Sequence, residues 1–284
     1  MRKFSKRVIA IMILFLFTTS LKVFGIENLS NVTRVQVLST GQSDAILLLS
    51  KDFNILIDTG VEEYSSKLIS QLKSESIDKL DYVILTHYHD DHFGGLEAVL
   101  KSVKVSHLML PEFCVNKAEK EKVMKVVEAS KVKYEYVKAG WYLEHNDIHL
   151  KALTPTKPSK VLENNNSMVL LGEIADLRYL FMADAERDLE KQIMKNKDIK
   201  DIDVLKVAHH GIGSGTYKDF VRKVKPSVAI ITSNGEESPN SEVVKNLTDI
   251  KCNVFRTDQY GDVMVLSEKD DAGVVHLEVY SRKN

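Results

Sequence analysis

The amino-acid sequence predicts an α/β fold in which two β-sheets pack against each other and helices cover their outer faces. Short runs of β-branched and aromatic residues alternate with segments of helical spacing, and this order occurs once in each half of the chain. The 284 residues are 44% hydrophobic, which is enough for a substantial core. No Gly-, Ser- or Pro-rich linker interrupts them, so we expect one domain over residues 32–282.

The elements follow from local composition and spacing. In the first half we expect strands at 34–38, 45–49, 54–57 and 80–85, where apolar and β-branched residues cluster, and helices at 65–74, 96–102 and 117–130, where apolar residues recur at helical spacing. In the second half the same criteria give strands at 149–153, 167–171, 179–182, 204–207, 227–232, near 254, 263–266 and 274–280, and helices at 185–195, 217–224 and 241–250. Gly94 and Gly95 separate the strand at 80–85 from the helix that follows it.

The first 25 residues are typical of a secretory signal peptide. Basic residues in positions 2–7 precede an apolar run at 8–17, and Val23 and Gly25 have the spacing that a signal peptidase prefers. The run is shorter than the ~20 residues of a membrane span. We therefore expect export, with an uncleaved N-terminal membrane anchor as the alternative.

The charge of the mature chain argues against non-specific nucleic-acid binding. Residues 1–25 carry five basic side chains and no acidic ones, so cleavage would move the formal net charge from −1 to −6. Tight non-specific binding to nucleic acid needs a basic surface. The lysine-rich stretch 117–138 is interleaved with glutamates and is typical of a solvated helix face.

The two cysteines, Cys114 and Cys252, lack the CxxC spacing of a metal or redox site. Export would permit a disulfide between them, but the sequence does not show whether they meet.

The densest chemical signal is the segment Thr86–Gly95, which directly follows a predicted strand. It contains three histidines and a carboxylate at HxHxDH spacing: His87, His89, Asp91 and His92. Imidazole and carboxylate together suit zinc, iron or manganese. The sequence therefore predicts a metal site here, and one that can hold two metals if more ligands come from elsewhere.

Further ligands are expected at two other strand ends. Asp184 follows the apolar strand at 179–182 and precedes a predicted helix, where a carboxylate either caps the helix or binds something. His209 and His210 follow the strand at 204–207. In a chain that already holds HxHxDH, both positions become candidate metal ligands.

These motifs, in this order, resemble the metallo-β-lactamase superfamily of metal-dependent hydrolases. Along the chain the matching segments are Gly41-Gln42-Ser43-Asp44-Ala45, Asp58-Thr59-Gly60, His87-Tyr88-His89-Asp90-Asp91-His92, Asn164-Asn165-Asn166-Ser167, Met182-Ala183-Asp184-Ala185-Glu186, Asp203-Val204-Leu205-Lys206, His209-His210-Gly211 and Arg256-Thr257-Asp258. The chain looks most like the C-terminal hydrolase domain of the competence protein ComEC and its free-standing relatives. The resemblance covers about residues 32–280 and implies an αββα sandwich of two mixed sheets.

The resemblance also implies roles for individual residues. His87 and His89 would hold one divalent metal, Asp91 and His92 the second, and Asp184 would bridge them. One histidine of the pair His209 and His210 would complete the second site, and the other would touch the substrate. Asp58 would orient a ligand by a hydrogen bond. The implied catalytic residues are Asp91 and His210, and Asn166 and Ser167 are the expected substrate contacts.

Departures from the superfamily pattern concern the surroundings of the site. A further metal histidine of many members is replaced by the segment 164–167, as in the ComEC-like branch. Ser43 and Ala183 stand in place of glycines, and Ile212 in place of a serine. The metal ligands themselves are intact.

The expected function is an exported, binuclear metal-dependent hydrolase of a phosphodiester, with a metal-bridging hydroxide as the nucleophile. Zn²⁺ is expected first and Mn²⁺ second. The expected partner is a small-molecule or polymer substrate that carries phosphate; nucleic acid is not favoured, and membrane contact is expected only with an uncleaved N-terminus. The alternatives are a secreted nuclease, an esterase of phosphorylated cell-wall or lipid head groups, and a non-catalytic binding protein stabilised by metal.

Overall fold

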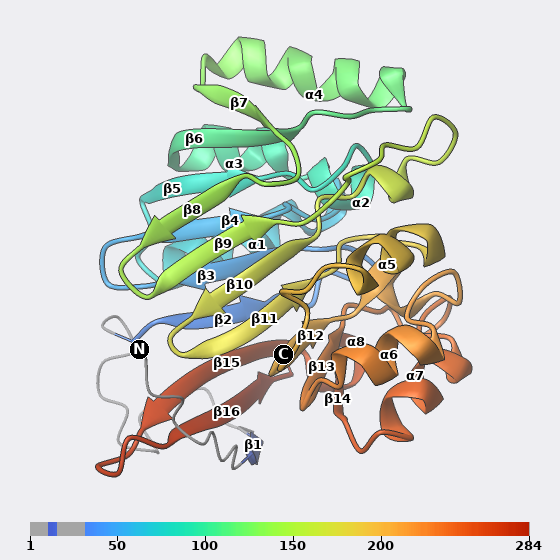
Figure 1. Cartoon of the computed structure of the whole chain (residues 1–284). Coiled ribbons are helices and arrows are strands. Elements are labelled where there is room, and N and C mark those ends of the chain that lie inside the picture. The colour runs from blue at the N-terminus through green and yellow to red at the C-terminus, as the bar shows by residue number, and fades with distance from the viewer. Residues whose placement is uncertain (1–10, 16–31, 284) are drawn as a thin grey trace.

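Two β-sheets pack face to face, with helices on both outer sides (Figure 1). The computed structural model describes residues 11–15 and 32–283. The nine-stranded first sheet has the order β1 (Ile11–Phe15), β16 (Val275–Arg282), β15 (Asp262–Lys269), β2 (Arg34–Val37), β3 (Ile46–Leu49), β4 (Asn54–Ile57), β5 (Lys79–Ile84), β6 (Lys104–Pro111) and β7 (Tyr134–Val137). The seven-stranded second sheet has the order β14 (Asn253–Arg256), β13 (Val228–Ile231), β12 (Val204–Lys206), β11 (Leu177–Phe181), β10 (Leu170–Ile174), β9 (Ile148–Ala152) and β8 (Tyr142–His145).

Both sheets are mixed. In the first sheet β2, β3 and β4 pair antiparallel, whereas β4, β5, β6 and β7 run parallel. In the second, β8 to β11 are antiparallel and β11 to β14 are parallel. The predicted αββα sandwich is confirmed.

Three apolar layers hold the sandwich together. Alternate strand residues such as Val35 and Leu150 point into the layer between the sheets. On the outer face of the first sheet lie α1 (Ser65–Ser74), α2 (Asp90–Phe93), α3 (Leu96–Ser102) and α4 (Lys117–Ser130). The second sheet is covered by α5 (Arg187–Met194), α6 (Lys218–Val224) and α7 (Ser241–Thr248), and the short α8 (Thr257–Tyr260) links β14 to β15.

Several predicted elements need correction. The strands β6, β7 and β8 were not predicted, and the strand expected at 167–171 is β10, which begins at Leu170. Asp91 and His92 lie in the one-turn helix α2, an element that was not predicted.

Both cysteines are free. Cys252 is buried in the layer between the second sheet and its helices, whereas Cys114 packs against the corresponding layer of the first sheet. The two thiols therefore belong to different cores.

The predicted signal segment, residues 1–25, falls mostly outside the described residues. Only Ile11–Phe15 is described, as β1, which pairs parallel with β16 at the edge of the first sheet. Across the described ranges, none of the helices combines the length and apolar character required to span a bilayer.

Candidate metal centre

The predicted ligands come from loops that follow the carboxyl ends of strands in both sheets. The HxHxDH segment follows β5, Asp184 follows β11, and the histidine pair follows β12. Because β11 and β12 are adjacent parallel strands, their loops emerge at the same edge. Ligands that are far apart in the sequence therefore come together at this edge, one loop from the first sheet and two from the second.

His87, His89 and Asp184 form one group whose ligand atoms all lie within 4.8 Å of one another. His87 Nε2 lies 3.2 Å from His89 Nδ1 and 3.7 Å from Asp184 Oδ2. His87 and Asp184 are buried, and His89 is half-buried. This group matches the first of the two metal positions expected from the sequence.

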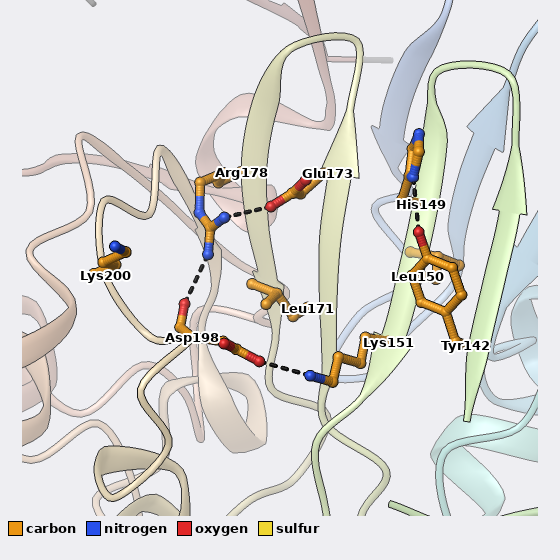
Figure 2. Close-up of a pocket in the computed structure, with 9 residues that line it drawn as sticks. All are labelled: Tyr142, His149, Leu150, Lys151, Leu171, Glu173, Arg178, Asp198 and Lys200. Atoms are coloured by element: carbon orange, nitrogen blue, oxygen red, sulfur yellow. Dashed lines mark hydrogen bonds and ion pairs between the residues drawn. The ribbon is translucent and has the colours of Figure 1, made fainter. Parts of the chain in front are cut away.

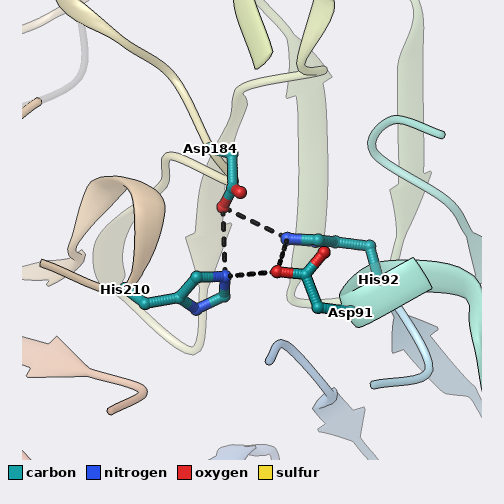
Figure 3. Close-up of side chains that lie close together, drawn as sticks. All are labelled: Asp91, His92, Asp184 and His210. Atoms are coloured by element: carbon teal, nitrogen blue, oxygen red, sulfur yellow. Dashed lines mark hydrogen bonds and ion pairs between the residues drawn. The ribbon is translucent and has the colours of Figure 1, made fainter. Parts of the chain in front are cut away.

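The second group consists of Asp91, His92, Asp184 and His210, and Figure 3 shows these four side chains turned toward one another. Asp184 Oδ1 lies 3.1 Å from His92 Nε2 and 3.3 Å from His210 Nε2. Asp91 Oδ2 lies 3.2 Å from His210 Nε2. Asp184 thus belongs to both groups, with one carboxylate oxygen toward each.

Three atoms in the centre are buried without a hydrogen bond: both carboxylate oxygens of Asp184 and Nε2 of His92. Leaving a buried carboxylate unpaired is costly, and native proteins avoid it unless an ion or water completes the site. Imidazole nitrogens and carboxylate oxygens are the ligands that zinc and manganese take. The residues present therefore fit a pair of divalent metals that share Asp184.

Asp58 orients His92 from behind. Its Oδ2 lies 2.7 Å from His92 Nδ1, and its Oδ1 and Oδ2 accept hydrogen bonds from the Thr86 backbone and hydroxyl at 2.8 Å each. A carboxylate on the far nitrogen fixes the tautomer and ring orientation of a metal-binding histidine. This is the contact that the sequence led us to expect of Asp58.

The electrostatics of the centre favour a cation. Burial alone would raise the pKa of Asp184, but His92 and His210 hold it well below its usual range. Burial would lower the pKa of His210, yet Asp184 and Asp44 raise it to about 9. The carboxylates thus create a negative field, and the same field attracts a divalent metal ion.

An ion pair that we did not anticipate supports His210. Asp44 Oδ1 lies 3.3 Å from His210 Nδ1 and accepts a hydrogen bond from the Thr232 hydroxyl at 2.6 Å, and that hydroxyl lies 2.9 Å from the same Nδ1. Asp44 Oδ2 lies 2.9 Å from Lys206 Nζ, and both side chains are buried. Burial would raise the pKa of Asp44, but Lys206 and His210 hold it well below its usual value. The sequence feature that could have indicated this ion pair is Lys206, a lysine inside an otherwise apolar strand.

His209 belongs to neither metal group. Its Nε2 lies 3.5 Å from Asp184 Oδ2 and 3.3 Å from Asn164 Nδ2, while its Nδ1 lies 2.8 Å from the Ser214 hydroxyl. Of the two histidines, His210 is therefore the one that joins the second group, whereas His209 lies beside Asp184 outside both groups.

Asn166 and Ser167, the expected substrate contacts, are buried, and neither belongs to the two metal groups. Asn166 Oδ1 accepts the Ser159 N–H at 2.8 Å, and its Nδ2 donates to the Ser159 carbonyl at 3.2 Å. Its amide therefore closes the loop at 159–166. Asn164, two residues earlier, is the asparagine that reaches His209.

Left-handed backbone marks the residues around the ligands. Asp58, Ala183, His209 and His210 have φ between 46° and 56°. Non-glycine residues adopt this region at a cost of roughly 1–2 kcal/mol each, and such strain concentrates at functional sites. The turn after β12 thus aims the two rings in different directions.

A separate hollow of about 270 Å³ lies on the outer face of the second sheet, away from the metal residues (Figure 2). Four of its charged residues interact among themselves, Arg178 with Glu173 and the Asp198 carbonyl and Lys151 with Asp198 at 2.6 Å, whereas Lys200 takes no part in these pairs. This self-pairing leaves little charge for a ligand.

The sequence matches the family model described as the metallo-beta-lactamase superfamily over residues 38–233. Two solved structures share the fold at low sequence identity. The metallo-beta-lactamase fold protein YhfI from Bacillus subtilis is 15% identical, with a TM-score of 0.56 over 80% of this chain and 96% of that chain. The β-hydroxylase CmlA from Streptomyces venezuelae is 10% identical, with a TM-score of 0.55 over 80% of this chain and 53% of that chain.

Relatives in sequence include competence and recombination proteins. ComE operon protein 3 of Bacillus subtilis is 32% identical over 256 residues, which is 83% of this chain and 33% of that protein. Recombination protein 2 of Haemophilus influenzae is 29% identical over 240 residues, which is 82% of this chain and 28% of that protein. The chain spans about a third of the length of these relatives, and the resemblance to the ComEC-like branch is confirmed. With its fold and family-model match, the chain belongs to the metallo-β-lactamase superfamily.

Proposed function

We propose that this chain is a binuclear metal-dependent hydrolase of phosphodiesters that acts outside the cytoplasmic membrane. The observation that carries the proposal is the convergence of two ligand groups on Asp184. Two divalent ions that share a bridging carboxylate supply an activated water and positive charge for the oxygens of a displaced ester. Hydrolysis is the chemistry that this arrangement serves best.

Individual residues of the chain would bind the ions, accept a proton and contact the substrate. His87 and His89 would hold the first ion, and Asp91, His92 and His210 the second, with Asp184 between them. Asp91 is 27% exposed, more than the rest of the second group, so its carboxylate is the one that meets solvent and substrate. Asp91 Oδ2 lies 3.2 Å from His210 Nε2 and would bind the second ion, so we assign the other carboxylate oxygen, Oδ1, to take the proton released when water is activated. His209 Nε2, which lies 3.5 Å from Asp184 Oδ2, would contact the substrate.

A phosphodiester suits this centre because its anionic oxygens complement two divalent cations, whereas a neutral amide gains less. The relative named Recombination protein 2 brings DNA into the range of phosphodiesters to be tested. The acidic balance of the mature chain points instead to a small ester or a phosphorylated polymer. We favour Zn²⁺, with Mn²⁺ second. PqqB from Methylobacterium extorquens, which shares the fold with a TM-score of 0.50, was solved with Zn²⁺ bound.

The test is a substrate screen with zinc- and manganese-loaded protein. Bis(p-nitrophenyl) phosphate, p-nitrophenyl phosphate, a lactone and a β-lactam would be compared in the same assay. The expected result is metal-dependent turnover of the diester above the other three. Preference for the lactone or β-lactam would overturn the phosphodiester assignment, and metal binding without any turnover would favour a binding protein.

Two further assays distinguish the alternative substrates. Cleavage of single-stranded DNA that persists as salt rises would favour a secreted nuclease. Release of phosphorylated head groups from cell-wall polymer or lipid would favour the esterase alternative.

A further inference from the structure

A hollow of about 430 Å³ opens beside the metal residues and shares part of its wall with them. Its lining includes His89, a member of the first metal group. It also includes Asn164, whose Nδ2 lies 3.3 Å from His209 Nε2. A substrate held at the metals by its phosphate would therefore have room for one of its ester groups here.

The wall of this hollow is a built part of the fold. Glu163 is buried, and its carboxylate accepts backbone N–H groups from Tyr88 at 3.3 Å, Val115 at 2.5 Å and Asn116 at 3.0 Å. One side chain thus ties the histidine motif to the segment that precedes α4. The hollow keeps its shape because three separate segments are pinned together around it.

The rim presents two apolar side chains to water. Val161 is 78% exposed and Leu162 is 48% exposed. Their backbone N–H groups donate to the Ser159 hydroxyl at 3.2 and 3.0 Å, and Asn166 holds Ser159 from the other side. An ordered loop that exposes adjacent apolar residues at the mouth of a pocket is typical of a ligand contact.

The charge of the lining narrows the choice of ligand. The hollow is lined by Val115, Asn116, Val161, Leu162, Glu163, Asn164, Glu186 and His89, so it contains neither lysine nor arginine. The carboxylate of Glu163 is occupied by backbone N–H groups, and that of Glu186 accepts from Asn164 Nδ2 at 3.4 Å. Such a lining, which carries carboxylates and no cationic side chain, disfavours a second phosphate, and the exposed side chains of Val161 and Leu162 favour an apolar group.

We propose that this hollow binds an uncharged apolar group, aryl or alkyl, that is esterified to the phosphate held at the metal centre, with Val161 and Leu162 as its contacts. The inference rests on the proposed function, because it places the phosphate at the metals. It goes further by naming the class of ester group and the two side chains that select it.

The test compares the binding of phenylphosphonate and methylphosphonate to the zinc-loaded full chain, which requires no turnover. Phenylphosphonate is expected to bind about tenfold more tightly, since its ring buries apolar surface against the rim. The double variant Val161→Ser/Leu162→Ser should lose most of that preference and keep its zinc content. Tyr142→Ser removes an equally exposed apolar ring on the outer face of the second sheet and should keep the preference.

Equal binding of the two phosphonates, or a preference that survives the double substitution, would overturn the inference while leaving phosphodiester hydrolysis intact. If neither phosphonate binds zinc-loaded protein that also fails to hydrolyse bis(p-nitrophenyl) phosphate, the proposed function is wrong and the ester-group assignment falls with it. Unchanged melting temperatures of the serine variants show that the comparison reports on binding, because both side chains are exposed.

Discussion

Asp184 is the residue on which both metal groups depend. Replacing it with alanine should remove at least one metal and lower hydrolysis by more than roughly a hundredfold, because no other carboxylate among residues 32–283 belongs to both groups. If Asp184 were only a helix cap, its loss would cost about 1 kcal/mol of stability and leave the metals in place. Elemental analysis together with turnover of bis(p-nitrophenyl) phosphate distinguishes the two cases.

Asp188→Ala is the matched control for this experiment. Asp188 lies four residues later on α5, is exposed, and pairs with Lys191 at the surface. Its replacement should leave metal content and turnover unchanged. An Asp184→Ala protein that behaves like this control would remove the bridging role.

Lys206 acts on the centre through Asp44. Lys206→Met should lower stability by about 3 kcal/mol, because it leaves the buried carboxylate of Asp44 without its partner. It should also weaken metal binding by roughly tenfold or more, because Asp44 no longer holds the His210 ring in place. Metal titration and thermal unfolding measure the two effects separately.

Lys206→Arg keeps the charge and should recover part of the metal affinity. A protein in which Lys206→Met lowers the melting temperature but binds metal with native affinity would reduce Lys206 to a structural ion pair.

Residue types and spacing made His87, His89, Asp91, His92, Asp184, His209 and His210 candidate metal ligands, because imidazole and carboxylate clusters have few other uses at strand ends. Their division into two groups that share Asp184 was implied by the family resemblance. Residue types and spacing did not identify Asp44 or Lys206 as partners, since these residues are 162 positions apart and their pairing depends on the packing of two sheets. The sequence left open which of the two adjacent histidines joins the second group, because both follow the same strand, and the left-handed backbone found at both positions does not distinguish them.

At the scale of elements, two of the three undetected strands, β7 and β8, share a physical feature, whereas β6 lies inside its sheet between β5 and β7. β7 and β8 lie at the edges of their sheets, and most residues of β7 are exposed. An edge strand has neither a continuous buried run nor a clean alternation, so periodicity does not reveal it. The predicted start of β10 was too early because Met168 and Val169 are apolar but do not belong to the strand. The Met168 N–H donates to the Thr86 carbonyl, and the Val169 carbonyl accepts from the Leu153 N–H.

The close approach of α2 and α3 to the loop after β4 depends on Gly95. A Cβ at this position would lie 2.3 Å from the Thr59 backbone oxygen. Gly95→Ala should therefore lower the free energy of unfolding by about 2 kcal/mol or more, since backbone must move to relieve the clash. Thr59 also bonds the His92 carbonyl, so metal affinity should fall as well.

Gly140→Ala provides the comparison, because a Cβ there would meet nothing within 4 Å. Its φ of 97° leaves only backbone strain, worth about 1 kcal/mol. Equal losses in the two variants, measured by denaturant unfolding, would contradict the packing role of Gly95.

Helix α5 carries a buried carboxylate that should make stability depend on pH. Burial raises the pKa of Glu190 to about 7, although backbone N–H groups of Thr216 and Tyr217 partly oppose the shift. The folded protein therefore holds this proton more tightly than the unfolded chain. Its stabilising contribution is complete below the unfolded pKa of 4.5 and is lost as the pH rises through 7.

Glu190→Gln should remove this dependence. Relative to the native protein, the variant should gain about 2 kcal/mol of stability between pH 5 and pH 8, as measured by urea unfolding at both values. Glu242→Gln, an exposed position on α7, should show no such gain. A constant difference between Glu190→Gln and the native protein across this range would contradict the assignment.

At the scale of the whole molecule, the N-terminal segment predicts that the protein is exported. The basic segment at 2–7, the apolar run at 8–17 and the Val23/Gly25 pair predict that protein recovered from outside the cytoplasmic membrane begins near Ile26. N-terminal sequencing of the fractionated protein is the measurement. An intact Met1 terminus on cytoplasmic protein would contradict export, and the same terminus in the membrane fraction would favour the anchor.

The composition of the metal centre also sets the order of events during maturation. Asp91 and His210 lie 119 residues apart, one from each half of the chain, and they meet only when the two sheets have packed. Closing so long a loop comes late in folding, so the ions cannot template the early steps. Ions that bind this centre would therefore enter a nearly finished protein, and those available in the compartment where folding ends would determine which metal it carries.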